Sequence, residues 1–97
     1  MGGDPQGVFV LRVEAVAGPD NSEPDGRRHA ILVFALAATP EAAEAVARAG
    51  LDQRGWIDTR VLSSGEITDE DAVPQDLRGA MARAKASGCA LIVYEAP

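Results

Sequence analysis

The sequence is short of the features that mark several large classes of protein. It contains one cysteine, so no disulfide forms within the chain and a disulfide-stapled secreted domain is excluded. Aromatic residues make up 4% of the chain, which is poor for a sheet that stacks nucleic-acid bases. The longest apolar run, residues 30–38, is about half the length that a membrane-spanning helix needs.

Positive charge is also scarce. Nine Lys and Arg residues stand against fifteen Asp and Glu residues, which gives a net charge of −6. Binding to phosphate backbones or anionic lipid needs a concentrated positive field, so we predict no nucleic-acid partner and no membrane partner. Residues 1–7 lack the basic and apolar regions of a signal peptide. The predicted location is therefore the cytoplasm, and the alanine-rich composition suggests a bacterial-type protein.

The residues that are present describe a small, ordinary globular domain. The chain has 97 residues, of which 25% are charged and 46% hydrophobic. This length corresponds to a single domain, residues 1–97, with a small core. We expect residues 1–7 to be flexible. The turn formers that follow residue 17 predict a mobile loop over residues 18–28.

Hydrophobic patterning predicts four strands and two helices. Residues 8–17 alternate as a half-buried strand does, and residues 56–67 carry charges on one face, as an edge strand does. Residues 29–37 and 89–94 are apolar on both faces, so we expect both to be central strands covered on two sides. The helices are expected over residues 39–49, with Gly50 just beyond the end, and over residues 74–87, with Gly88 ending the helix.

The order of these elements, β-β-α-β-α-β, predicts an α+β domain with a four-stranded mixed sheet. Each helix is interpreted as a crossover, so the last three strands are expected to run parallel. We favour a two-layer sandwich related to ferredoxin-like folds, with both helices on one face. The alternative is a three-layer arrangement with one helix on each face.

The two-layer arrangement leads to a prediction about association. It leaves apolar residues such as Ile31 and Val33 on an open sheet face, and a second copy of the chain is the simplest cover for such a face. The candidate interface residues are Trp56, Tyr94, Ile31 and Val33. This argument depends on the two fully apolar strands being shielded on both sides, and it fails if either strand lies at an edge.

No set of residues in the sequence predicts catalysis, a cofactor or a metal. Cys89 opens an apolar strand and is expected to be a buried small hydrophobe rather than a nucleophile. His29 lies beside Arg27 and Arg28, where a solvated loop end is favoured over an anion site. The acids of residues 66–71 lack the spacing of a calcium loop. Phosphate-loop and dinucleotide-binding glycine motifs are absent.

Three functions remain as hypotheses. The leading one is a non-enzymatic association module, either a homodimer or a subunit that docks on another protein. The alternative is a regulatory domain that senses a small molecule near Thr39 or Asp71, at a helix N-terminus. The least favoured is a small enzyme completed across a dimer interface, which would use His29 and a carboxylate such as Glu14.

Overall fold

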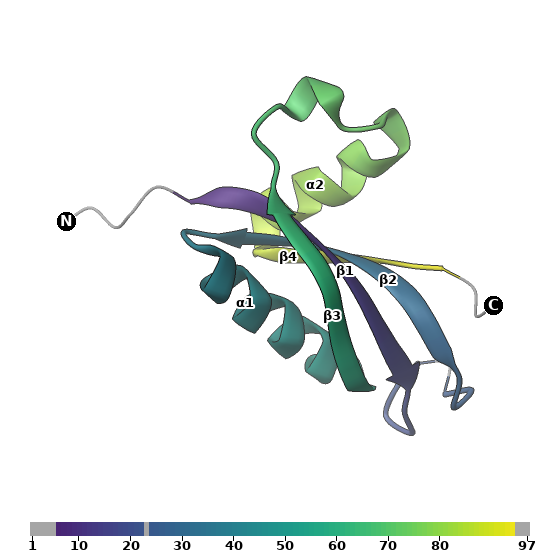
Figure 1. The fold of residues 1–97 in the computed structure, drawn as a ribbon. Helices are drawn as coiled ribbons and strands as arrows, with labels where there is room; N and C mark the ends of the chain where they lie inside the picture. Colours follow the sequence, from purple (N-terminus) through teal and green to yellow (C-terminus); the bar gives the residue numbers. More distant parts are fainter. Residues whose placement is uncertain (1–5, 23, 95–97) are drawn as a thin grey trace.

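A computed structural model describes residues 6–22 and 24–94 and shows one four-stranded sheet with two α-helices. The chain belongs to the α+β class, and its strands lie in the order β3-β1-β2-β4 (Figure 1). The elements are β1 (Gly7–Ala17), β2 (Arg28–Ala37), α1 (Pro40–Gln53), β3 (Trp56–Glu66), the 3-10 helix η1 (Glu70–Ala72), α2 (Gln75–Ser87) and β4 (Cys89–Val93).

The sheet is antiparallel throughout, so the prediction of a mixed sheet is wrong. β1 pairs antiparallel with both β2 and β3, and β2 pairs antiparallel with β4. One row of the sheet shows the reason, because Glu66, Phe9, Ala35 and Cys89 lie side by side in it. β3 therefore ends where β4 begins, and the two strands run in opposite directions. β2 and β3 do run parallel, but β1 lies between them.

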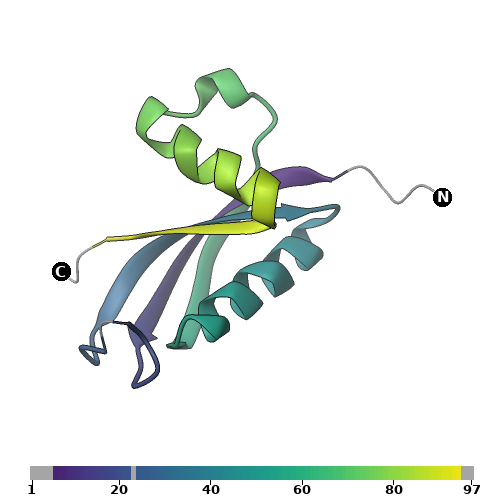
Figure 2. The same ribbon diagram turned by 180° about the vertical axis from the view of Figure 1, so that it is seen from behind.

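The two helices lie on opposite faces of the sheet (Figures 1 and 2). α1 packs on a core formed by odd-numbered positions of β1 and β2, from Phe9 to Ala17 and from Ile31 to Ala37. α2 packs on a second core that contains Val8, Phe34 and Ala90. The arrangement is therefore the three-layer alternative, and the favoured two-layer sandwich is not what the chain adopts.

β4 is an edge strand, which overturns the expectation that it is central. The strand pairs with β2 alone among the described elements, and β1 is the second central strand in its place. Apolar residues on both faces of a strand show that both faces are covered, but they do not show whether its edges are paired. Helices on both sides of the sheet cover β4 in part, so the sequence-based argument for association loses its premise.

α1 begins where the sequence predicts and ends later. Thr39 caps it by accepting a hydrogen bond from the Ala42 N–H at 3.1 Å, and Pro40 occupies the first turn. The helix continues through Gly50 to Gln53, so Gly50 does not terminate it. A Cβ at Gly50 would lie 2.9 Å from the Sγ of Cys89. This glycine therefore serves the close approach of α1 to β4.

β3 is an edge strand, as predicted, but two irregularities change which way its side chains face. Its register with β1 shifts between Arg12 and Val13 and again between Glu14 and Val16. At the second shift Asp58 has a φ of 50°, in the left-handed region. Ile57 and Val61 therefore lie on opposite faces of the sheet, although simple alternation predicts one face for both.

α2 confirms its predicted stripe and end. Met81 and Ala84 are buried, Leu77 packs at the margin of the same core, and Gly88 closes the helix with a φ of 97°. The acids before it begin η1, where the Asp69 side chain accepts from the Asp71 N–H. Residues 1–5 lie outside the described part of the chain, while Gly7 already belongs to β1. The mobility expected for residues 1–7 and 18–28 stays a prediction.

Candidate binding surfaces

α2 covers only one end of its face of the sheet (Figure 2). At the other end a shallow hollow of about 330 Å³ is left, and we call the surface around it the open sheet face. Two of its large apolar side chains are markedly exposed, Leu62 at 53% and Tyr94 at 45%. The residues that define it are Arg12, Glu14, Ala30, Leu32, Leu62 and Tyr94.

The open sheet face carries charges of both signs. Arg12 and Glu14 lie two residues apart in β1, so both point out of the same face. Neither forms an ion pair with another described residue. At the far end of this face Arg28 reaches across β1 and forms an ion pair with Asp58, whose left-handed backbone turns it toward the arginine.

A second hollow, of about 550 Å³, follows the free edge of β4, and we call it the β4 groove. Its apolar lining includes Leu91 and Val93 of β4 and the largely buried Trp56. Arg54 borders it from the C-terminal end of α1, and Arg83 borders it from α2. Among residues 6–22 and 24–94, those that line the groove include these two arginines and no carboxylate.

The backbone of β4 directs hydrogen-bonding groups into this groove. Leu36 donates to the Gly88 carbonyl at 2.9 Å, and Tyr94 donates to the Ala30 carbonyl at 2.9 Å. In an antiparallel pair the residues that bond to the partner alternate with residues whose backbone groups point away. The register therefore turns the N–H and C=O groups of Leu91 and Val93 outward. The outward carbonyl of Cys89 accepts from the Ser87 hydroxyl at 3.3 Å.

The two edges of the sheet are protected unequally. β3 has two register shifts and carries the charged side chains of Asp58 and Arg60, features that discourage the pairing of another strand. β4, with the sequence CALIV, has neither a charge nor a register shift. The β4 edge is thus the one at which an added strand meets least hindrance.

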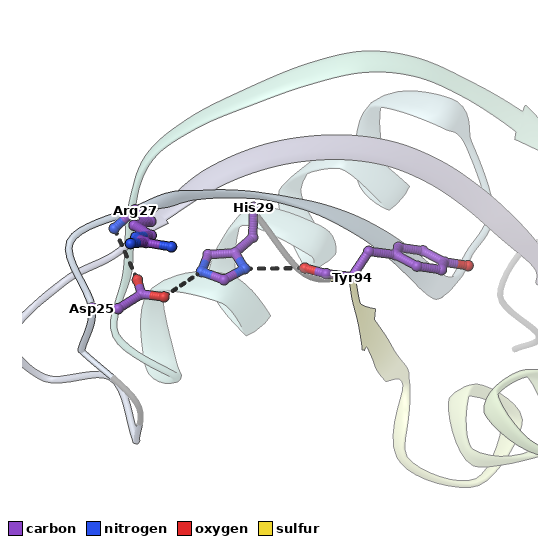
Figure 3. A network of polar contacts seen from close by, with 4 residues as sticks. All are labelled: Asp25, Arg27, His29 and Tyr94. Atoms are coloured by element: carbon purple, nitrogen blue, oxygen red, sulfur yellow. Dashed lines mark hydrogen bonds and ion pairs between the residues drawn. The ribbon is translucent and has the colours of Figure 1, made fainter. Parts of the chain in front are cut away.

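A small polar network fastens the end of β4 to the β1–β2 loop (Figure 3). The Nδ1 of His29 lies 3.0 Å from the Tyr94 carbonyl, and its Nε2 lies 2.8 Å from a carboxylate oxygen of Asp25. Asp25 also accepts from the Arg27 N–H at 2.8 Å. The imidazole and the Trp56 ring pack edge to face, with the two ring centres 5.5 Å apart.

The partners of His29 define its charge. A carbonyl oxygen and an ionised carboxylate both only accept hydrogen bonds, so this geometry needs a proton on each ring nitrogen. The Tyr94 carbonyl and then Asp25 raise the pKa of His29 above its usual value. The hydrogen bond from Arg27 and the contact with His29 lower the pKa of Asp25. The network is therefore an imidazolium–carboxylate pair at pH values between the lowered pKa of Asp25 and the raised pKa of His29.

The structure places the four candidate interface residues in different surroundings. Ile31 and Val33 face α1 and are 2% and 0% exposed, so they are inaccessible to a partner of the folded chain. Trp56 is also buried, against His29. Tyr94 alone is exposed.

The residues considered for catalysis do not come together. His29 pairs with Ala15 in the sheet and faces α1, whereas Glu14 points out of the opposite face. Cys89 is half-buried, and its burial raises the pKa of the thiol, against an opposing effect of Arg54. Among the described residues no group of His, Cys, Asp and Glu side chains is placed to hold a metal ion.

Sequence reasoning named Trp56 as a candidate interface residue, but it did not predict the β4 groove that Trp56 lines. Arg54 and Arg83 lie 29 positions apart on different helices, and only the tertiary fold brings them to the same strand edge. The contact between His29 and Asp25, four residues apart in the chain, was open to local inspection, but its third partner, the Tyr94 carbonyl, was not.

Comparison with known protein families, with curated protein sequences and with solved structures finds no match to this chain. In the described part of the chain no helix has both the length and the apolar character needed to cross a membrane. The function proposed below therefore depends on the geometry of the molecule.

Proposed function

We propose that this protein is a non-enzymatic association module that forms a homodimer through its open sheet face. The observation that carries the proposal is that α2 leaves one end of its face uncovered, with Leu62 and Tyr94 exposed beside charged residues that form no ion pair with another described residue. Isolated exposed apolar residues are common on proteins. Two of them around one hollow on a sheet face favour a contact surface.

The charge pattern supports a second copy of the chain as the occupant. Two sheets that pack face to face keep their strands nearly aligned. A two-fold axis that lies between the two sheets near Val13, perpendicular to the strands, places Arg12 of each copy opposite Glu14 of its partner. An isologous contact of this kind satisfies both charges at once. Arginine, tyrosine and leucine around a hollow also suit the buried centre of an interface.

The size of the surface predicts a weak dimer. Four strands about 4.8 Å apart and some five residues long give a flat footprint of roughly 300 Å². A standard interface buries about 800 Å² of accessible surface on each partner. The open sheet face is smaller than this standard area, so we expect exchange between monomer and dimer at micromolar concentrations.

Sedimentation or light scattering over a range of concentrations tests this proposal. The chain should approach the dimer mass at high micromolar concentration, and Leu62→Glu should return it to the monomer. Ala45→Glu adds the same charge on the solvent side of α1 and should leave the dimer intact. A monomer at every concentration contradicts the proposal.

A charge exchange locates the interface. Arg12→Glu and Glu14→Arg should each weaken the dimer, because each places like charges opposite one another. The double variant restores opposite charges and should recover most of the affinity. If the double variant is as weak as the two single variants combined, the proposed two-fold arrangement is wrong.

A further inference from the structure

We propose that the β4 groove receives an extended acidic segment of a partner protein, which adds to the sheet as a fifth strand beside β4. The groove and the open sheet face are separate surfaces, and this proposal does not depend on the homodimer. Four features carry it: backbone groups that have no partner in the described part of the chain, an unprotected edge, an apolar floor and two arginines.

The backbone supplies the main attachment. The N–H and C=O groups of Leu91 point outward together, so one partner residue opposite Leu91 forms two hydrogen bonds with it. Val93 offers a further pair of groups. Strand addition of this kind takes its affinity from main-chain hydrogen bonds and its specificity from the alternate side chains.

The side chains around the edge define what the added strand carries. Partner residues opposite Leu91 and Val93 turn toward α1 and meet the apolar surface that includes Trp56. A residue opposite Cys89 turns the same way and meets Arg54, whose Nη1 lies near the Cys89 thiol and donates to the Gly50 carbonyl at 2.9 Å.

Arg83 completes the charge pattern from the other side of the sheet. It belongs to α2, which packs on the face of Ala90. A partner residue opposite Ala90 therefore turns toward Arg83, while its neighbour opposite Cys89 turns toward Arg54. Two adjacent carboxylates on the partner strand match the two arginines, and apolar residues at alternate positions match the floor.

Charge complementarity selects a partner other than this chain's own β4. The protein has a net charge of −6, yet the described residues that line its groove include two arginines and no carboxylate. Pairing with the β4 of a second copy would bring Cys89–Val93 against these arginines, and that strand has no acid. An acidic extended segment satisfies both the backbone and the arginines.

The test uses a synthetic peptide that alternates valine and threonine and carries two adjacent glutamates at its C-terminal end. The Leu62→Glu variant serves as the protein, so that dimer formation does not interfere. Nuclear magnetic resonance titration should shift the amide signals of Cys89, Leu91 and Val93. Replacing the two glutamates by glutamines, or Arg54 and Arg83 together by glutamine, should weaken binding by about tenfold.

A proline substitution tests the backbone contact. The N–H of Val93 points outward, so Val93→Pro removes a donor from the groove without removing a hydrogen bond to β2. It should weaken peptide binding by at least about tenfold, whereas Val93→Thr, which keeps the N–H, should bind within about twofold of the parent.

Several outcomes overturn the proposal. Absence of binding at millimolar peptide does so, and so do signal changes that map to the open sheet face or binding that is unchanged in Val93→Pro. The mass of the unmodified chain is measured separately. Absence of the dimer and absence of peptide binding to the β4 groove are therefore told apart.

Discussion

The face of the sheet under α1 is covered along its length, whereas the face under α2 is covered at one end only. On the α1 face all five inward residues of β1, from Phe9 to Ala17, are buried. On the α2 face Val8 is buried, but Arg12 is exposed and Glu14 is partly exposed. The same central strand thus forms a continuous core on one side and a partly wet surface on the other.

The helices explain this difference. α1 presents Ala43, Ala47 and Gly50 to the sheet, and such small residues let its backbone approach closely. α2 follows η1 and lies over β4 and the adjoining end of β2. The comparison indicates that the α1 face provides most of the stability, while the α2 face leaves surface for contacts with other molecules.

The largest effect is expected from shortening a core side chain on the α1 face. Leu51 is fully buried there, so Leu51→Ala should lower the free energy of unfolding by about 3 kcal/mol. Leu77 is only partly buried under α2, and Leu77→Ala should cost about 1 kcal/mol. Urea unfolding followed by the fluorescence of the single tryptophan measures both. Equal losses would show that the two faces are packed equally well.

The close approach of α1 to β4 gives the next effect. Gly50→Ala gains helix propensity, but its Cβ would meet the Cys89 thiol, so we expect a net loss of about 1 kcal/mol. Adding Cys89→Ala removes the sulfur, and the double variant should be more stable than Gly50→Ala alone. If the second substitution destabilises further, the contact with the thiol is not what limits this position.

The His29 network should make stability depend on pH. The raised pKa of His29 adds stability that is full below about pH 6.5 and is lost as the pH rises through the folded-state value. The lowered pKa of Asp25 adds stability that is present above about pH 3.8 and is lost as the pH falls. The contribution of the network is therefore greatest between these two values.

His29→Gln should remove the loss of stability that the network causes as the pH rises through the pKa of His29. The parent chain should melt at lower temperature at pH 8 than at pH 6, and the variant should show a smaller difference between the two. An unchanged difference in the variant would assign the pH effect to another group. The ring signals of His29, followed by magnetic resonance, should titrate above the usual histidine pKa.

The smallest effect is expected at the far end of the open sheet face. Arg28→Gln breaks the ion pair with Asp58, but both groups are partly exposed and the pair is screened by water. The free energy of unfolding should fall by less than about 0.5 kcal/mol. A loss above 1 kcal/mol, measured by the same urea unfolding, would show that this end of the face is more tightly organised than its exposure indicates.

Sequence patterns predicted local structure well. The alternation from Phe9 to Ala15 identified the buried side of β1, Thr39 marked the start of α1, and Gly88 marked the end of α2. Each of these signals depends on backbone preferences or on burial within a few residues. Gly50 misled because a glycine that permits close packing resembles a glycine that ends a helix.

Strand order and the binding surfaces were beyond such patterns. Alternation reports which faces of a strand are covered, but it does not report which edges are paired, so β4 was placed in the centre. The shift at Asp58 reversed the side of Ile57 relative to Val61, and a one-residue shift leaves no periodic signal. The meeting of Arg54 and Arg83 depends on tertiary packing.

The position of β1 in the middle of the sheet has a consequence for how the chain is assembled during synthesis. All the buried residues of the α1 cluster lie between Phe9 and Trp56, so this half of the core can close before residues 57–94 leave the ribosome. The outer edge of β2, however, has no strand to pair with until Cys89–Val93 has been made. β4 therefore shields an edge of the sheet that was made some fifty residues earlier.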